Sequence, residues 1–130
     1  MSLLEIKNLN VVYKVEGKEI RAVREVSLDV NSRDAIGIVG ESGSGKSTLA
    51  MAILRLLPDR TSKTTGEIIF DGVDILNMDE EQLREIRWKD IAVVFQKSMN
   101  SLSPVHKIGY QMKDIYRVHN QDAKDEEIRK

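Results

Sequence analysis

The stretch from Gly40 to Ser47 constrains this chain more than any other part of its sequence. It reads GESGSGKS and matches G-x-x-x-x-G-K-[ST] at every specified position. Its glycines let the backbone turn tightly, so that successive N–H groups can donate to one phosphate. Lys46 is expected to reach the β- and γ-phosphates, and the Ser47 hydroxyl is expected to ligate Mg²⁺. The stretch therefore predicts a nucleotide phosphate site, formed by Gly40, Glu41, Ser42, Gly43, Ser44, Gly45, Lys46, Ser47 and Thr48.

The flanking sequence favours this site over a glycine-rich turn without a ligand. Residues 35–39 (AIGIV) form an apolar run without alternation, which predicts a strand covered on both faces. Residues 48–57 (TLAMAILRLL) predict a buried helix that Pro58 ends. The order of strand, loop and helix is the context that this motif requires, and the helix N-terminus would add partial positive charge.

The chain begins with a β-layer ahead of the loop. Leu4 and Ile6 alternate in one phase and residues 9, 11 and 13 in the other, so we expect either a bulge near Asn8 or two short strands. Ala22, Val26, Leu28 and Val30 keep even spacing and predict a half-buried antiparallel strand, with Arg24 as the exception. Tyr13 has two interpretations at this point: an aromatic side chain that packs at a sheet edge, or a flat ring on which a nucleotide base stacks.

Beyond the helix, the sequence predicts further short elements. Residues 59–65 are polar and predict a loop, and residues 66–72 (GEIIFDG) predict a short strand that ends in an Asp-Gly turn. Asp71 follows an apolar run as a Mg²⁺-organising carboxylate would, but the turn is the preferred interpretation because Gly72 comes next. Residues 77–89 predict a surface helix with Leu83 and Ile86 facing inward, and Trp88 is expected in the core.

A second unalternated apolar run, residues 91–95 (IAVVF), predicts another buried strand and leads directly into Gln96. Polar side chains at the carboxyl end of a parallel strand are where open α/β sheets place ligand groups, although Gln96 could also be a solvated loop residue. Ile108, Met112 and Ile115 then predict a helix with a core-facing or partner-facing stripe. His106 and His119 have no neighbours at ligand spacing, and no metal role is assigned to them.

Composition narrows the classes of function. The 130 residues are 41% hydrophobic and 32% charged, which fits one modest globular domain. The net charge of −1 gives no indication of a nucleic-acid partner. The start lacks the pattern of a signal peptide and no apolar run approaches membrane-spanning length, so the expected location is cytoplasmic.

Four features, in order along the chain, resemble the amino-terminal half of an ABC transporter ATPase subunit. They are Tyr13, GESGSGKST at 40–48, GEIIFDG at 66–72 and VVFQ at 93–96. The stretch FQKSMNSLSPVHKIG at 95–109 is most similar to subunits that energise oligopeptide, dipeptide and nickel importers. The sequence differs from the residues usual in this family at Ser32-Arg33-Asp34, Lys97-Ser98 and Ser103. These differences concern the subfamily and the transported substrate rather than the nucleotide site.

The resemblance implies roles for single residues and for partners. Tyr13 matches the aromatic residue on which adenine stacks, and Gln96 matches the glutamine that contacts Mg²⁺ and the attacking water. Lys46 and Gln96 are thus the catalytic candidates, Ser47 and Gln96 the metal ligands, and ATP with Mg²⁺ the cofactors. Transmembrane permease subunits and a second ATPase subunit are the implied partners, with the protein peripheral on the inner face of the cell membrane.

The fold class that follows is α/β: a P-loop NTPase (RecA-like) core with an amino-terminal antiparallel β-layer, truncated at the start of the helical subdomain. Residues 1–100 are expected to hold the incomplete core and residues 101–130 the beginning of the helical subdomain. The family's LSGGQ stretch, its catalytic Asp-Glu pair and its switch histidine have no counterpart here. We therefore expect this chain to bind ATP without hydrolysing it, and its residues 35–39 to present an unpaired apolar edge.

Two alternatives from other classes remain at this point. One is a nucleotide-binding module that functions at this length without catalysis. The other is a compact P-loop kinase or GTPase, which would need a second acidic Mg²⁺ ligand, and Asp71 is the only candidate for it.

Overall fold

A computed structural model describes residues 2–95 and 102–124 of the chain. The chain divides into two units, residues 1–79 and residues 80–130. The first unit contains the sheet and the phosphate-loop motif, and the described part of the second contains two helices. The predicted boundary at residue 100 stays a prediction.

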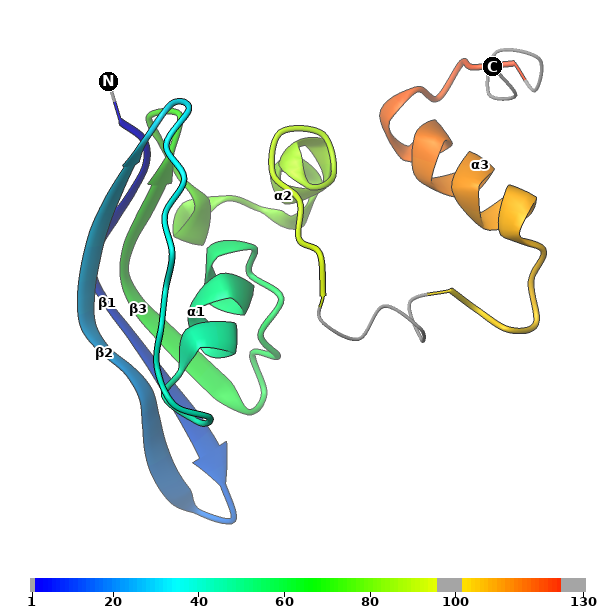
Figure 1. The fold of residues 1–130 in the computed structure, drawn as a ribbon. Coiled ribbons are helices and arrows are strands. Elements are labelled where there is room, and N and C mark those ends of the chain that lie inside the picture. Colours follow the sequence, from blue (N-terminus) through cyan, green and yellow to red (C-terminus); the bar gives the residue numbers. More distant parts are fainter. Residues whose placement is uncertain (1, 96–101, 125–130) are drawn as a thin grey trace. The chain divides into compact units, whose positions relative to one another are not determined.

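A four-stranded antiparallel sheet forms the first unit (Figure 1). The strands lie in the order β2-β1-β3-β4, so β1 is paired on both sides. Their bounds are β1 Ser2–Val15, β2 Lys18–Asn31, β3 Ser62–Phe70 and β4 Val73–Asp74. The predicted antiparallel β-layer is therefore confirmed.

Two tight turns set the pairing of these strands. β1 passes into β2 through Glu16-Gly17 and β3 into β4 through Asp71-Gly72, and all four residues have positive φ. Two-residue turns of this kind match the right-handed twist of the flanking strands, and the second position favours glycine. The prediction of an Asp-Gly turn is confirmed, and it places Asp71 in a hairpin turn.

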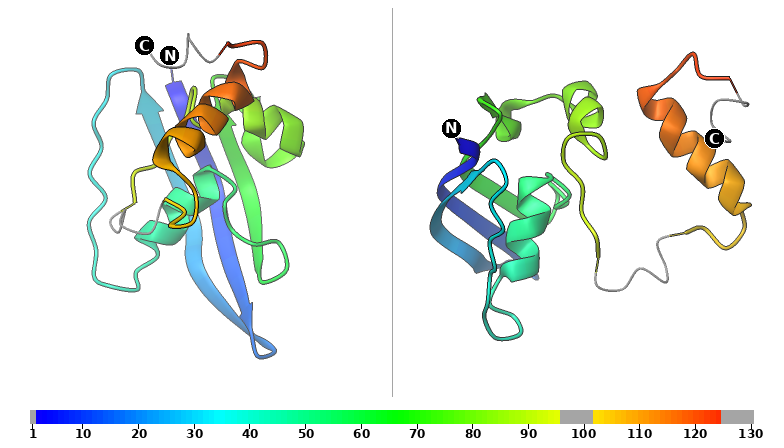
Figure 2. Two further views of the ribbon diagram at one scale, coloured as in Figure 1. Left: turned by 90° about the vertical axis from the view of Figure 1, so that its right-hand side faces the viewer. Right: turned by 45° about the horizontal axis from the view of Figure 1, so that its top comes forward.

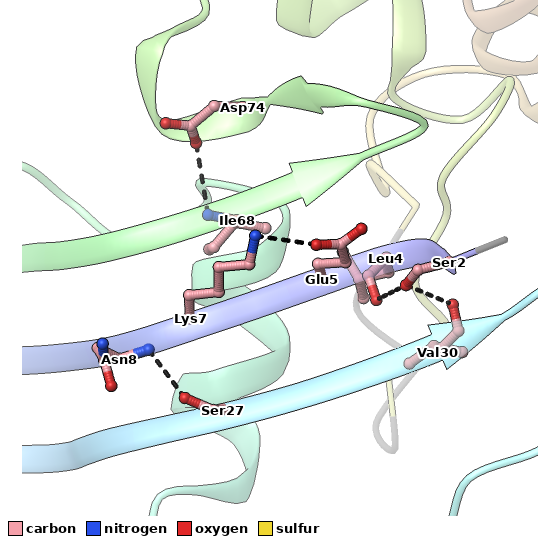
Figure 3. A network of polar contacts seen from close by, with 9 residues as sticks. All are labelled: Ser2, Leu4, Glu5, Lys7, Asn8, Ser27, Val30, Ile68 and Asp74. Carbon is pink, nitrogen blue, oxygen red and sulfur yellow. Dashed lines mark hydrogen bonds and ion pairs between the residues drawn. The ribbon is translucent and has the colours of Figure 1, made fainter.

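Of the two alternatives at Asn8, the structure has the bulge, within the single strand β1. The pairing of β1 shifts register between Ile6 and Leu9 on the β2 side, and Asn8 has φ 47. Its N–H donates instead to the Ser27 hydroxyl at 3.0 Å (Figure 3). The extra residue reverses the alternation, so Ile6 before the bulge and Leu9 after it are both fully buried on one face.

A second bulge explains the exception at Arg24. Glu25 has φ 46, and its N–H donates to the Asn10 side-chain oxygen at 3.1 Å. Val26 pairs with Leu9 but Val23 with Val11, so one extra residue is accommodated on β2. Val23 is consequently buried. Ala22, which the even spacing of apolar residues predicted to face the core, is only half-buried.

Helix α1, Lys46–Ile53, lies against one face of the sheet (Figures 1 and 2). It ends four residues before the predicted position, because Arg55 adopts a left-handed conformation (φ 49). The Arg55 N–H donates to the carbonyl of Ala52 and the Leu56 N–H to that of Met51, which is the Schellman pattern of helix termination. The buried apolar side chains of this unit come from the sheet, α1 and the segments that follow them: Ile6, Leu9, Val11, Val23, Leu49, Ala52, Leu54, Ile68 and Ile75.

The buried strand predicted at residues 35–39 is wrong. This segment carries no strand pairing among the described residues, and all five of its residues are exposed, with Val39 at 94%. It runs as an extended trace between β2 and the loop (Figure 1). The expectation of burial is therefore wrong, and because the segment forms no strand here, the expectation of an unpaired strand edge stays a prediction.

The loop predicted at residues 59–65 is also partly wrong, since β3 already begins at Ser62. Its first residues pair with the end of β1, Tyr13 with Ser62 and Val11 with Thr64. Polar residues at 62–65 resemble a loop by composition, but pairing with β1 determines their structure. Downstream, a 3-10 turn, η1 Ile75–Asn77, is capped by the Asp74 carboxylate, which accepts from the Leu76 N–H at 3.0 Å.

The second unit contains α2, Glu80–Ile86, and α3, Ile108–His119. Both predicted helices exist, α2 being shorter than the predicted 77–89, and Leu83 is buried as expected. Trp88 is 59% exposed with φ 67, so its predicted core position is wrong. The strand predicted at 91–95 is wrong as well: Ile91 makes a single bridge to Arg87, and Val94 is 94% exposed.

Along α3, the apolar stripe predicted from Ile108, Met112 and Ile115 is exposed in this structure. In the parts of the chain that the structure describes, none of the helices has both the length and the apolar character needed to cross a bilayer.

Candidate functional site

The predicted phosphate loop leads directly into α1. Gly45 occupies the N-cap position, and the first helical hydrogen bond runs from the Leu49 N–H to the Gly45 carbonyl at 2.9 Å. The N–H groups at the start of a helix therefore follow the loop at once, and such groups bind anions. Residues 41–44 are exposed, and so is Ser47 in the first turn.

Lys46 is folded over its own loop. Its ammonium donates to the carbonyl oxygens of Gly40 and Glu41, each at 2.7 Å, and to the Ser44 hydroxyl at 3.2 Å. These contacts close the loop into a ring around one positive charge. Gly40 is tightly placed within it, because a Cβ at that position would lie 2.7 Å from the Ser44 hydroxyl oxygen. A loop that is already closed around an ammonium suits the recognition of phosphate.

Gly45 is the point at which the loop contacts the sheet. It has φ 96, and a Cβ there would lie 2.2 Å from the carbonyl oxygen of Ala22 in β2. Any side chain at residue 45 would thus collide with main-chain atoms and occupy an unfavourable backbone conformation. No sequence pattern indicates the part that Ala22 plays, because the contact involves only its backbone.

Tyr13 lies near the loop, as the nucleotide prediction requires. Its hydroxyl is 3.1 Å from the Thr48 hydroxyl in the first turn of α1, and its side chain is half-buried. Tyr13 pairs with Ile20 on one side and Ser62 on the other. The interpretation of Tyr13 as a residue at a sheet edge is therefore wrong, because β1 is an interior strand.

A cavity of about 590 Å³ borders the loop on its β2 side. Its lining combines residues of β2, the segment Ile38–Gly40, the loop residues Gly43–Lys46 and Leu49. Tyr13, Ser47 and Thr48 are not among the lining residues. The candidate nucleotide site is thus defined by the loop and Tyr13 rather than by this mainly apolar cavity.

The other predicted site residues are placed as follows. Gln96, the predicted contact of Mg²⁺ and water, lies outside the described residues. Within the described ranges, no group of three His, Asp or Glu side chains could hold a metal ion. His106 contacts the Ser103 hydroxyl at 2.9 Å through Nδ1 and stacks on Tyr110.

A glycine-rich loop that closes on a lysine and opens a helix beside an aromatic residue defines a nucleotide-binding protein of the P-loop class. The sequence pattern of the ABC transporter family matches residues 23–130. The chain belongs to this family.

Individual relatives agree with this assignment. A "Probable peptide ABC transporter ATP-binding protein" of Sinorhizobium fredii is 43% identical over 129 residues, which are 98% of this chain and 38% of that protein. The "Oligopeptide transport ATP-binding protein" of Bacillus subtilis is 37% identical over 124 residues, 95% of this chain and 35% of that protein. The chain thus spans little more than a third of the length of these relatives.

Solved structures agree with the predicted fold class. A dimeric ATP-binding cassette in a post-hydrolysis state, bound to ADP and Pi, aligns with a TM-score of 0.75 and 28% identity. The alignment covers 97% of this chain and 52% of that cassette. The α/β fold of the P-loop ATPase type is therefore confirmed, although the parallel strands predicted at 35–39 and 91–95 are not formed here.

Proposed function

We propose that this chain is the nucleotide-binding part of an ABC importer subunit and that its loop binds ATP or ADP with Mg²⁺. The closure of the loop around Lys46 at the start of α1 is the observation that carries this proposal. On phosphate binding, the ammonium exchanges carbonyl partners for β- and γ-phosphate oxygens, which form stronger charge-assisted hydrogen bonds. The N–H groups from residue 43 to Thr48 donate to the same phosphates.

Ser47 fits the role of a magnesium ligand. Mg²⁺ is usually held by one or two protein oxygens together with phosphate oxygens and waters, and Ser47 offers an exposed hydroxyl beside Lys46. The ion would neutralise charge between the β- and γ-phosphates. Gln96 is proposed as a further contact of the ion and of the attacking water.

In the intact protein, we infer that ATP binding and hydrolysis are coupled to the import of peptides or a related small solute. The names of the Sinorhizobium and Bacillus relatives support this substrate class. Transmembrane permease subunits and a second ATPase subunit are the proposed partners, and the dimeric solved cassette supports the latter. The proposed location is the cytoplasmic side of the membrane, through the permease partners.

The chain of 130 residues is proposed to bind ATP without turning it over. Hydrolysis needs a positioned general base. The polar contacts of the loop in the described chain come from an ammonium, hydroxyls and main-chain carbonyls, and none of these groups serves as that base.

Calorimetric titration with Mg-ATP tests the proposal. Lys46→Ala should weaken binding by about 1.5–3 kcal/mol, the range for hydrogen bonds to a charged group. Lys18→Ala, at the exposed start of β2, is the matched control and should bind like the wild type. Nucleotide at a hundred times its Kd should stabilise the wild type by about 2.7 kcal/mol and raise its Tm. Equal affinity of the wild type and Lys46→Ala would reject the loop as the binding site.

A further inference from the structure

Arg55 connects the end of α1 to a distant part of the first unit. Its backbone is left-handed, with φ 49, and its N–H completes the helix end by donating to the Ala52 carbonyl. Its half-buried guanidinium donates through Nη1 to the carbonyl oxygen of Ile75, at 3.4 Å, and to that of Met78. We call this pair of hydrogen bonds the Arg55 clamp. Because the donor is charged and partly shielded from water, such bonds are stronger than those between neutral groups.

The clamp acts where the first unit ends. Its acceptors are the first residue of η1, Ile75, and the residue that follows this turn, Met78. The Met78 N–H itself donates to the Ile75 carbonyl at 3.3 Å, so the guanidinium and this amide share one acceptor. Met78 lies one residue before Asp79, the last residue of the first unit. The clamp therefore holds residues 75–78, through which the chain leaves the first unit.

The opposite end of α1 carries the phosphate site. Lys46 and Ser47 stand in its first turn, and Arg55 follows its last. α1 has only eight residues, about two turns, and a single remaining turn is unstable because starting a helix costs more than extending it. We therefore expect α1 to form and open as one unit. When it opens, the N–H groups that receive phosphate are lost together with the helix end that directs the Arg55 side chain.

We propose that the Arg55 clamp couples nucleotide binding at the loop to residues 75–78. The inference rests on the proposed function and extends it from the loop to the end of the first unit. A phosphate binds the N–H groups at the start of α1 only while the helix is formed, so bound nucleotide lowers the population of the open helix. Because the clamp ties residues 75–78 to the end of the same helix, this segment then opens less often as well.

Amide hydrogen exchange, followed by NMR on the full chain with and without Mg-ADP, tests the coupling. In the wild type, Mg-ADP at a hundred times its Kd should slow exchange at residues 51–53 of α1 and at Met78 by the same factor, up to about a hundredfold. Arg55→Met removes the donors and keeps a long unbranched side chain. It should keep the slowing at 51–53 and lose it at Met78. Arg60→Met, the same change at an exposed position after α1, is the matched control and should behave like the wild type.

Three results would overturn the inference. Slowing at residues 51–53 without slowing at Met78 in the wild type would mean that the segment opens independently of α1, and this comparison decides even if Arg55→Met does not fold. Full slowing at Met78 in Arg55→Met would mean that the packing of Ile75, rather than the clamp, carries the coupling. No slowing at either place would reject nucleotide binding by the loop, which Lys46→Ala tests separately, and the inference with it.

Discussion

The β1–β2 hairpin and the segment at 35–39 are both rich in β-branched residues, yet only the hairpin forms paired structure. Ile6, Leu9 and Val11 in β1 are at most 1% exposed, whereas Ile36 and Ile38 are 46% and 49% exposed. Apolar and polar residues alternate along the strands of the hairpin, and only the two residues Glu16-Gly17 separate each strand from its partner. The segment does not alternate, so it needs cover on both faces and partners from elsewhere in the chain. Apolar content alone therefore does not determine whether a run becomes a strand.

The hairpin and the segment at 35–39 also differ in how much they stabilise the folded chain. Burial of a Val or Ile side chain contributes about 1.5–3 kcal/mol, and the hairpin realises this at several positions. The exposed segment realises little of it, while its unpaired backbone remains a template for another strand. The stability of the first unit thus comes from the antiparallel sheet and α1, and the segment before the loop adds little to it.

The largest effect is expected from a matched pair of substitutions. Ile6→Ala leaves a cavity at a fully buried position and should destabilise the chain by about 2–5 kcal/mol. Ile38→Ala makes the same chemical change at a half-exposed position and should stay within about 0.5 kcal/mol of the wild type. Urea unfolding with a common m-value measures both free energies of unfolding. Similar losses in the two variants would mean that residues 35–39 are buried in solution.

A smaller effect concerns the unpaired backbone. Amide hydrogens at 36–39 should exchange with almost no protection, whereas those at 9–13 in the interior strand β1 should exchange only on global unfolding. The apolar edge should also cause self-association, which light scattering after size-exclusion detects. Ile38→Lys should reduce that association, because a charge on an edge opposes pairing.

Monomers with strong protection at 36–39 would contradict this expectation. The sheet would then be completed in a way that the described residues do not reveal.

The smallest effect comes from the solvent-facing side of the hairpin. The Glu5 carboxylate, 3.0 Å from the Lys7 ammonium, raises the pKa of Lys7 above its usual 10.5 through a hydrogen bond and charge attraction (Figure 3). A pKa that is raised on folding gives stability that is present below pH 10.5 and lost as the pH rises through the higher folded value. The loss should be small, because the pair is solvent-exposed.

Urea midpoints at about pH 8 and about pH 11 measure this loss, since that interval brackets the ordinary lysine pKa. Glu5→Gln is the control, because it removes the charge and keeps the shape. The wild type should lose slightly more stability over this interval than Glu5→Gln, and an equal loss in both would show that the pair contributes nothing.

The sequence was sufficient to predict the features that depend on local chemistry. The motif at 40–47, the Asp71-Gly72 turn and the phase switch near Asn8 each carry their signal within a few residues, and the structure has the loop, the turn and the bulge. The features that were missed depend on distant partners. Residues 62–65 form a strand because they pair with β1. Residues 35–39 and 91–95 do not form strands, because the described chain offers them no strand to pair with.

For the candidate site, too, the sequence predicted the local features and not the contacts between distant residues. The residue types of the loop follow from phosphate chemistry, whereas the contact of Tyr13 with Thr48 depends on how α1 lies on the sheet. The exposure of Trp88 was missed because its large apolar ring favours burial by type alone.

The close approach of Gly45 to the Ala22 carbonyl has a consequence for genetic experiments. Every amino acid at residue 22 presents the same carbonyl, so no replacement there removes the atom that a side chain at residue 45 would strike. A selection for second-site suppressors of Gly45→Ala should therefore yield no rescue from changes at residue 22. Suppressors would have to arise where the backbone of β2 can be displaced, such as the bulge at Glu25.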